Sequence, residues 1–367
     1  MSQVLFSQSR NTLSFSETRE NSLASSLTAY ERTAYQFCHD WLTGREVFTL
    51  QTSGSTGAPK SVTLHRRHMA ASAALTGQAL QLEPGDTALV NLHVQYIAGI
   101  MMLVRGLELG LHLTVQEPSA RPLEHWTPGV AFNFQSYVPL QLQNILEKTP
   151  EKIAVLNTAK AILVGGAPVS AMLEDQLQAV RAPVYQTYGM TETVSHIALR
   201  RLNGPEKQFF YTALDTISLE ADARGCLVIH APALTEQPVV TNDVVELLST
   251  STFRWLGRAD HVINSGGIKV QAEKVEQAVE KVLATAGILR RFFVAGLPHP
   301  VLGETVTLIL EGEPLSAVTE NSILQNLKAV LTTYEVPRQI RYISRFSETP
   351  TAKIDRKNTL QTLLKAQ

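Results

Sequence analysis

The chain has 367 residues, which is enough for two or three domains with a buried core that needs no disulfide bonds. Its 32 Lys and Arg residues against 33 Asp and Glu residues give a net charge of -1, and charged residues make up only 18% of the chain, so the composition excludes a strongly basic surface for nucleic acid. The two cysteines, Cys38 and Cys226, match no metal-ligand spacing, which excludes a disulfide framework and a structural zinc site and predicts a cytoplasmic protein.

Helical and β-rich segments alternate along the first two hundred residues. The start of the chain lacks the basic residues and apolar run of a secretory signal. The most apolar stretch, 97–113, is interrupted by Arg105 and Glu108, so we expect a buried helix and strand rather than a membrane span. The expected order is strand 47–51, helix 67–82, strand 87–92, helix 97–109, strand 111–115, helix 137–146 and strand 160–164. This alternation predicts a layered α/β domain with mostly parallel strands.

The alternation of helix and strand patterns ends at about residue 204. Short β-rich runs at 226–229, 239–240, 244–248 and 252–256 predict an appended, mainly antiparallel β subdomain. From residue 262 the pattern becomes that of a compact α+β domain that could fold alone, with helices at 271–283 and 320–332 and strands at 291–295, 305–310 and 339–343. We therefore expect a large N-terminal domain, 1–259, and a small C-terminal domain, 260–367.

The strongest local motif is the run Thr-Ser-Gly-Ser-Thr-Gly-Ala-Pro-Lys at 52–60, directly after a predicted strand. Its glycines let the backbone approach a ligand closely, its hydroxyl and N–H groups can donate to phosphate oxygens, and Lys60 adds a positive charge. It differs from the usual P-loop, because Pro59 stands where that motif needs glycine. The run predicts a phosphate cradle, with a flexible linker rich in serine and glycine as the alternative.

Three further motifs carry less information when each is taken alone. Residues 186–193 place an aromatic ring, hydroxyls and a carboxylate after a short β-rich run, which suits a nucleobase, phosphate and Mg²⁺. A tyrosine–glycine turn with a surface Glu192 is the plain alternative. Residues 256–260 read Leu-Gly-Arg-Ala-Asp at the expected domain boundary, and residues 349–356 place Lys353 in a polar tail, where a lone lysine is normally a solvated charge.

In this order the four motifs resemble the AMP-forming acyl-CoA synthetase superfamily of adenylating enzymes. The similarity runs from about residue 50 to residue 357 and includes further matches at 164–168, 241–243, 266–270 and 296–304. Within the superfamily, residues 188–196 and 137–142 look most like the o-succinylbenzoate–CoA ligases of menaquinone biosynthesis. Only about fifty residues precede the phosphate loop, where most relatives carry an extra subdomain, so the resemblance implies a shortened N-terminal domain.

The resemblance implies an ATP-binding site with Mg²⁺ and a catalytic lysine. Lys353 matches the lysine that reaches the substrate carboxylate and the α-phosphate; Thr191 would contact that phosphate, and Glu192 would coordinate Mg²⁺. The β- and γ-phosphates would be held by the cradle, residues Thr52, Ser53, Gly54, Ser55, Thr56, Gly57 and Lys60. The adenine and ribose would be held by Gly165, Gly166, Ala167, Gln186, Tyr188, Asp243 and Arg258.

Coenzyme A would then take the acyl group after a rotation of the C-terminal domain. Asp260 matches the hinge of the family, and rotation would withdraw Lys353 and bring Gly266 and Gly267 against the pantetheine arm. Asn242 and Ala352 stand where the family usually has glycine, and Tyr96 stands where it often has histidine. A backbone change beside Asp243 and a different acyl pocket are the expected consequences.

The acid substrate of such a ligase would carry a second, unreactive carboxylate and an aromatic ring. A matching pocket needs an apolar slot and a donor or cation, for which the candidates are His93, Tyr96, Arg105, Ser195 and His196. Each has a plain alternative: an arginine on an apolar helix is often a snorkelling or paired charge, and a histidine is often a structural residue.

Three functions stay open on the sequence. The first is a ligase that makes o-succinylbenzoyl-CoA; the second is the same chemistry on another aryl or fatty acid, or on a carrier-protein phosphopantetheine; the third is a non-catalytic nucleotide-binding relative. Retention of Lys353, Glu192, Asp243 and Arg258 counts against the third. The expected partners are small molecules, with no nucleic acid and no membrane. Because a missing layer would leave apolar surface uncovered, homodimerisation is a further hypothesis.

Overall fold

The computed structural model describes residues 3–7, 11–14, 27–51, 61–127, 129–349 and 354–365. Within them, one continuous sheet runs in the order β12-β13-β14-β15-β11-β10-β9-β8-β7-β5-β6-β1-β2. Its parallel part consists of β1 (Gln3–Phe6), β5 (Thr87–Val90), β6 (His112–Val115), β7 (Phe134–Tyr137), β8 (Ala161–Val164) and β9 (Val184–Gly189). The predicted α/β class with mostly parallel strands is confirmed for this part of the chain.

The antiparallel strands extend the same sheet instead of forming a separate layer. They are β10 (His196–Arg201), β11 (Tyr211–Ala213), β12 (Ser218–Ala221), β13 (Cys226–His230), β14 (Val239–Leu247) and β15 (Thr252–Arg258). β10 pairs antiparallel with β9 and so joins the two parts edge to edge. At the other end, β2 (Asn11–Ser14) pairs antiparallel with β1.

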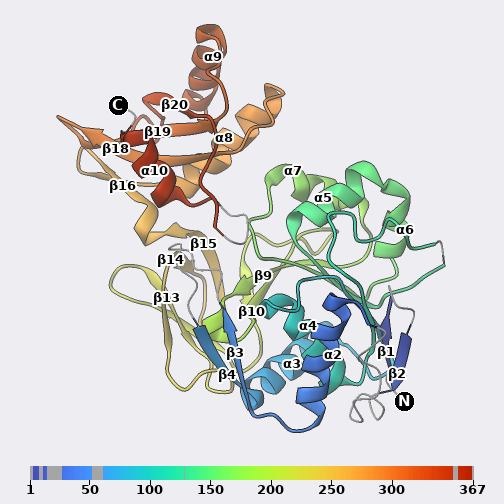
Figure 1. Ribbon diagram of the computed structural model, residues 1–367. Coiled ribbons are helices and arrows are strands. Elements are labelled where there is room, and N and C mark those ends of the chain that lie inside the picture. Colours follow the sequence, from blue (N-terminus) through green and yellow to red (C-terminus); the bar gives the residue numbers. More distant parts are fainter. Residues whose placement is uncertain are drawn as a thin grey trace.

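Two groups of helices cover opposite faces of the parallel strands. α2 (Ala29–Leu42), α3 (Arg66–Leu80) and α4 (Ile97–Leu109) share one apolar core with Ala161 and Leu163 of β8. The other face of β8, with Ile162 and Val164, packs with α5 (Pro139–Lys148), α6 (Ile153–Leu156) and α7 (Ala171–Gln176). This division follows from the alternation of side chains along a strand, and Figure 1 shows the two groups on either side of the strands.

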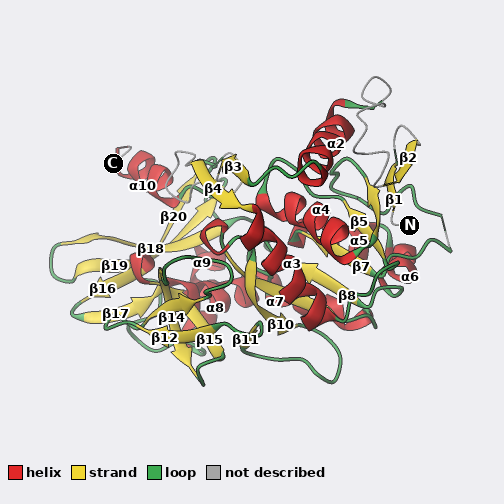
Figure 2. Ribbon diagram, turned by 90° about the horizontal axis from the view of Figure 1, so that it is seen from below, coloured by secondary structure: helices red, strands yellow, loops and turns green. Residues whose placement is uncertain are grey.

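The C-terminal residues form a second lobe with its own core. Its strands are β16 (Val262–Ser265), β17 (Ile268–Gln271), β18 (Phe292–His299), β19 (Gly303–Glu311) and β20 (Gln339–Ile343). Its helices are α8 (Ala272–Thr285), α9 (Ala317–Lys328) and α10 (Arg356–Lys365). Apolar side chains of α8, α9, β18 and β19 pack together, and Figure 2 shows this lobe at the opposite end of the molecule from β1 and β2.

Helix α8 and Gln271, the residue just before it, make hydrogen bonds between the two lobes. The carboxylate of Glu280 accepts a hydrogen bond from the Ala171 amide at 3.3 Å, and the Gln271 amide donates to the Arg258 carbonyl at 3.2 Å. Gly257, with φ +147°, makes this approach possible, since a Cβ there would lie 2.1 Å from Gln271 Nε2. In the described part of the chain, no helix is long and apolar enough to cross a bilayer.

Candidate active site at the carboxyl edge of the parallel strands

The carboxyl ends of β8 and β9 bring two of the predicted motifs side by side. The strands are parallel, and Val164 at the end of β8 is in register with Gln186 of β9. Gly165 and Gly166 follow β8 directly, and Gly166 has a φ of +81°. Loops at the carboxyl ends of parallel strands are the usual ligand site of an open α/β sheet. Gly165, Gly166, Ala167, Gln186 and Tyr188 therefore lie where such a site would be expected.

Gly165 has no room for a side chain. A Cβ on this residue would lie 2.2 Å from Thr187 Oγ1, so we expect Gly165→Ala to lower the unfolding free energy by about 1–3 kcal/mol through overpacking. Melting temperatures of Gly165→Ala, Thr187→Ala and the double variant test this. The Thr187→Ala change should restore most of the stability lost in Gly165→Ala, and a double variant whose two losses simply add would contradict the steric explanation.

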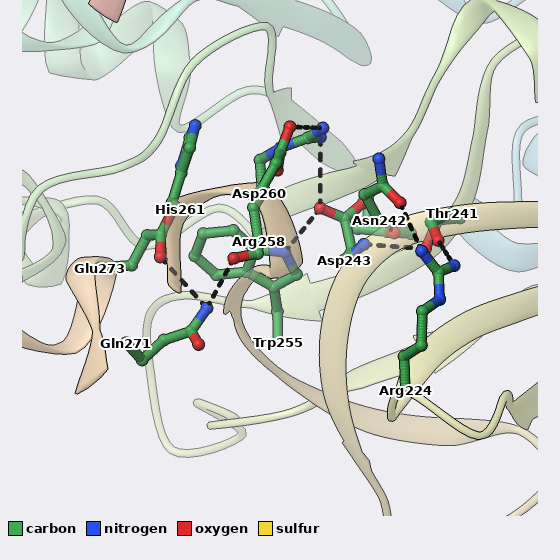
Figure 3. A network of polar contacts seen from close by, with 11 residues as sticks. Arg224, Thr241, Asn242, Asp243, Trp255, Arg258, Asp260, His261, Gln271 and Glu273 are labelled. Carbon is green, nitrogen blue, oxygen red and sulfur yellow. Dashed lines mark hydrogen bonds and ion pairs between the residues drawn. The ribbon is translucent and has the colours of Figure 1, made fainter. Parts of the chain in front are cut away.

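Asp243 is the centre of a second group of predicted residues, in the appended β strands (Figure 3). The Tyr188 hydroxyl donates to Asp243 Oδ2 at 2.6 Å, and Trp255 Nε1 donates to Oδ1 at 3.2 Å. Asp243 on β14 is in register with Arg258 on β15, whose Nη1 lies 3.6 Å from Oδ1. Burial, with the negative charge of Asp243 added, raises the pKa of Tyr188. The tyrosine is therefore neutral and acts as a donor to the carboxylate.

Arg258 connects this carboxylate with the predicted hinge. Its Nε and Nη2 donate to the two oxygens of Asp260 at 2.9 and 3.0 Å. Asp260 lies in the short 3-10 helix η4 (Ala259–His261), which separates β15 from the C-terminal lobe. Beyond it, His261 Nδ1 lies 2.5 Å from Glu273 Oε1, at the start of α8. The Gln271 amide, which donates to the Arg258 carbonyl and to Glu273 Oε2, continues these polar contacts from Asp243 and Arg258 into the C-terminal lobe, as Figure 3 shows.

Thr191 and Glu192 begin the short 3-10 helix η3 (Thr191–Thr193), just after β9. Glu192 is exposed, and within the described ranges it forms no ion pair. The described residues also contain no cluster of three or more metal-binding side chains. Mg²⁺ in nucleotide sites is usually bound by one or two carboxylates, with phosphate oxygens and water as its other ligands. A single exposed carboxylate such as Glu192 fits this role.

A strained turn follows Glu192. Val194 has φ +66° and ψ −51°, and the Ser195 amide donates to the Thr193 carbonyl at 2.7 Å, which makes Val194 the centre of a γ-turn. For a β-branched residue this conformation costs on the order of 1–3 kcal/mol and persists because its surroundings hold it. Val194 is buried. The turn redirects the chain between Glu192 and the pair Ser195 and His196.

Arg105 of α4 is buried beside that pair. Only 3% of it is exposed, and its Nη2 donates to Ser195 Oγ at 2.7 Å and lies 3.4 Å from His196 Nδ1. In the described part of the chain, no carboxylate pairs with it. Burial lowers the pKa of Arg105 to about 9, so the guanidinium is still charged at neutral pH. Burial and then the charge of Arg105 lower the pKa of His196 well below its usual value, which keeps the ring neutral.

The five predicted acyl-pocket residues divide into two groups. Arg105, Ser195 and His196 are in contact. Tyr96 precedes the first turn of α4, and its ring packs edge-on against exposed His93 with centroids 6.2 Å apart. Arg105 comes nine positions after Tyr96, which is roughly 13 Å along the helix axis. Thr76 of α3 also belongs to the Arg105 group, since its hydroxyl accepts from Arg105 Nε. This residue was not predicted, because a threonine inside an alanine-rich helix gives little signal.

Some predicted residues lie outside the described part of the chain. They are Thr52, Ser53, Gly54, Ser55, Thr56, Gly57, Lys60 and Lys353. The segments beside them are described: β3 (Val47–Gln51) and β4 (Ser61–His65) pair antiparallel, with Gln51 opposite Ser61. Gly266 and Gly267 form the two-residue turn between β16 and β17, with φ of +62° and +82°, a turn that favours glycine at both positions.

Comparison with known proteins agrees with this architecture. Residues 10–213 match the family model of AMP-binding enzymes. The solved structure of an acyl-CoA synthetase (AMP-forming)/AMP-acid ligase II-like protein from Dyadobacter fermentans is 43% identical, with a TM-score of 0.64, and the match covers 96% of this chain and 99% of that one.

Two further relatives are more distant. A 2-succinylbenzoate–CoA ligase of Geobacillus sp. (strain WCH70) is 25% identical over 83% of this chain, which spans 66% of that relative's length. The o-succinylbenzoate coenzyme A synthetase of Bacillus subtilis, solved with ATP and a magnesium ion, is 20% identical, with a TM-score of 0.71 and coverage of 97% and 83% of the two chains. At that identity the likeness concerns the fold.

Proposed function

The chain belongs to the AMP-binding enzyme family, and from this premise we propose that it is an AMP-forming ligase that joins o-succinylbenzoate to coenzyme A. The substrates are then the diacid, ATP and coenzyme A, with Mg²⁺ as the metal ion. The Geobacillus relative supports the choice of acid, and the Bacillus structure supports ATP and Mg²⁺. The chemistry proceeds through an acyl-adenylate and then a thioester.

The buried guanidinium of Arg105 is the observation that carries the choice of substrate. A buried charge without a partner is costly, and an acid that brings a second carboxylate into the site would supply the missing anion. A fatty acid or a simple aryl acid has only the carboxylate that reacts and would leave the guanidinium unpaired. Arg105, held beside Ser195 and His196, would therefore bind the unreactive carboxylate, while His93 and Tyr96 would lie toward the other end of α4.

Adenylation requires positive charge and donors around two approaching anions. In the proposal Lys353 supplies the charge at the reacting carboxylate and the α-phosphate, and Thr191 donates to that phosphate. Mg²⁺ held by Glu192 would neutralise part of the phosphate charge. Thr52, Ser53, Ser55, Thr56 and Lys60 hold the outer phosphates. Asp243 accepts from the ribose hydroxyls, and its contacts with Tyr188, Trp255 and Arg258 hold it in place.

Thioester formation follows a rotation of the C-terminal lobe about Asp260 in this proposal. Arg258 touches both Asp243 and Asp260, so the ribose site and the hinge share one guanidinium. Rotation would remove Lys353 from the site and place the Gly266–Gly267 turn beside the pantetheine arm, where side chains would obstruct it.

A panel of acids tests the proposal. The purified protein is given ATP, Mg²⁺ and coenzyme A with o-succinylbenzoate, benzoate, or a medium-chain fatty acid, and AMP and the thioester are measured. We expect kcat/KM to be largest for o-succinylbenzoate. A larger value for a monocarboxylic acid would contradict the proposed substrate, and formation of acyl-AMP without transfer to coenzyme A would point to a carrier-protein acceptor instead.

A further inference from the structure

We propose that Thr76 is a positioning residue, which orients Arg105 and fixes the tautomer of His196 so that one edge of the guanidinium is left for the unreactive carboxylate of the substrate. The expected change in KM rests on the proposed function, whereas the tautomer of His196 rests on the geometry of the described residues alone.

Thr76 lies on α3, which packs against α4, and it is fully buried. Its hydroxyl donates to the Ser72 carbonyl at 2.9 Å. A hydroxyl has one hydrogen, so Oγ1 can only accept from its two other neighbours. These are Arg105 Nε at 3.3 Å and His196 Nε2 at 3.3 Å. The direction of the first hydrogen bond thus fixes the direction of the other two.

This arrangement sets the tautomer of His196. Its Nε2 must carry the proton that it donates to Thr76, and because the ring is neutral its Nδ1 is then an acceptor. Nδ1 lies 3.4 Å from Arg105 Nη2, a donor. The opposite tautomer would place an N–H against the guanidinium and an acceptor against a hydroxyl that has no hydrogen to give.

The guanidinium is held by neutral acceptors on two of its three nitrogens. Nε donates to Thr76, and Nη2 donates to Ser195 Oγ at 2.7 Å and faces His196 Nδ1. Nη1 has only the sulfur of Met102, at 3.9 Å, among the described residues. Thioether sulfur is a weak acceptor, so the Nη1 edge keeps both its charge and its donors for a carboxylate.

Removing the Thr76 hydroxyl should therefore weaken recognition of the second carboxylate alone. Thr76→Val keeps the volume and branching of the side chain, and the Ser72 carbonyl remains within helix α3. Arg105 Nε loses its acceptor, and His196 becomes free to take the opposite tautomer. We expect KM for o-succinylbenzoate to rise about tenfold or more, with kcat and the KM for ATP nearly unchanged.

Kinetics with matched variants test this effect. Thr76→Ser should restore the KM for o-succinylbenzoate, since it returns the hydroxyl. Thr149→Val is the control, because Thr149 is another buried threonine bonded to the carbonyl four residues earlier and lies away from this group. The monoacids 4-oxo-4-phenylbutanoate and 2-butanoylbenzoate each lack one of the two carboxylates. The one that keeps the reactive carboxylate is the control substrate, and its KM should not respond to Thr76→Val. An equal rise in KM for diacid and monoacid would overturn the inference.

Nitrogen NMR of histidine-labelled protein provides the readout that does not depend on activity. The His196 signals, assigned with His196→Gln, should show a neutral ring protonated on Nε2 in the wild type, and Thr76→Val should change them. A ring protonated on Nδ1 would overturn the inference whatever the substrate. If Arg105→Met raises the KM for the diacid and Thr76→Val does not, Thr76 has no positioning role and the proposed function stands. If the wild type does not use the diacid, the proposed function fails, and the NMR result alone decides the role of Thr76.

Discussion

Lys353→Ala is expected to abolish adenylation of the acid and to spare thioester formation from pre-made acyl-adenylate. The reason is that adenylation brings two anions together while charge builds on the bridging oxygens, and a preorganised cation there is worth about a hundredfold to a thousandfold in rate. The second half-reaction transfers an acyl group that is already activated. The two steps are measured separately, by acid-dependent pyrophosphate exchange and by coenzyme A consumption with synthetic acyl-adenylate.

Lys357→Ala is the matched control for that experiment. Lys357 lies four residues further on, in the first turn of α10, and is exposed. The described residues on both sides of Lys353 are held by the fold: Glu348 pairs with Ile354 across a β-bridge, and Asp355 accepts from the Asn358 amide at 3.0 Å. Equal loss of both half-reactions in Lys353→Ala would contradict the proposed role of the lysine.

Arg105→Met is expected to raise the KM for o-succinylbenzoate by about tenfold to a hundredfold, because the charge-assisted hydrogen bonds to the second carboxylate are lost. The KM for monoacid analogues should change little. Stability gives a second and opposite expectation: the variant removes a buried cation that has no carboxylate partner among the described residues, so its melting temperature should stay the same or rise.

A purely structural role for Arg105 predicts the reverse outcome. If Arg105→Met lowers the melting temperature strongly and reduces activity with diacid and monoacid alike, the residue stabilises the fold and does not bind the second carboxylate of the substrate. Arg105→Lys distinguishes the effect of charge from that of shape. Lysine keeps the positive charge, but it lacks the planar guanidinium that donates to Thr76 and Ser195 at the same time.

The features predicted best from the sequence were those that depend on residues close together in the chain, such as single helices, single strands and short motifs. Alternation of helix and strand patterns predicted the parallel core, and the motifs around Gly165, Tyr188 and Arg258 predicted residues that the fold places at one edge of the sheet and in the adjoining strands. The predicted helix at 137–146 is Pro139–Lys148, because β7 (Phe134–Tyr137) precedes it. Polar Gln135 and Ser136 hid this strand, which is buried by neighbours on both sides.

Other features depend on contacts between distant segments and could not be predicted. The β-rich runs after residue 204 were predicted as an appended subdomain, but the pairing that joins them to the parallel strands, through β10 against β9, was not predicted. Strand β1 was not predicted, because it is defined by its pairing with β6, more than a hundred residues away. Thr76 gained its importance only when the fold brought His196, 120 positions further along the chain, within 3.3 Å.

Exchange of radiolabelled pyrophosphate into ATP, with o-succinylbenzoate as the only acid present, tests the central claim most directly. The account predicts exchange that requires the acid and Mg²⁺, is far weaker with a monocarboxylic analogue, and is lost in Lys353→Ala. Absence of acid-dependent exchange in the folded wild-type protein would contradict it and would favour a nucleotide-binding relative without catalysis.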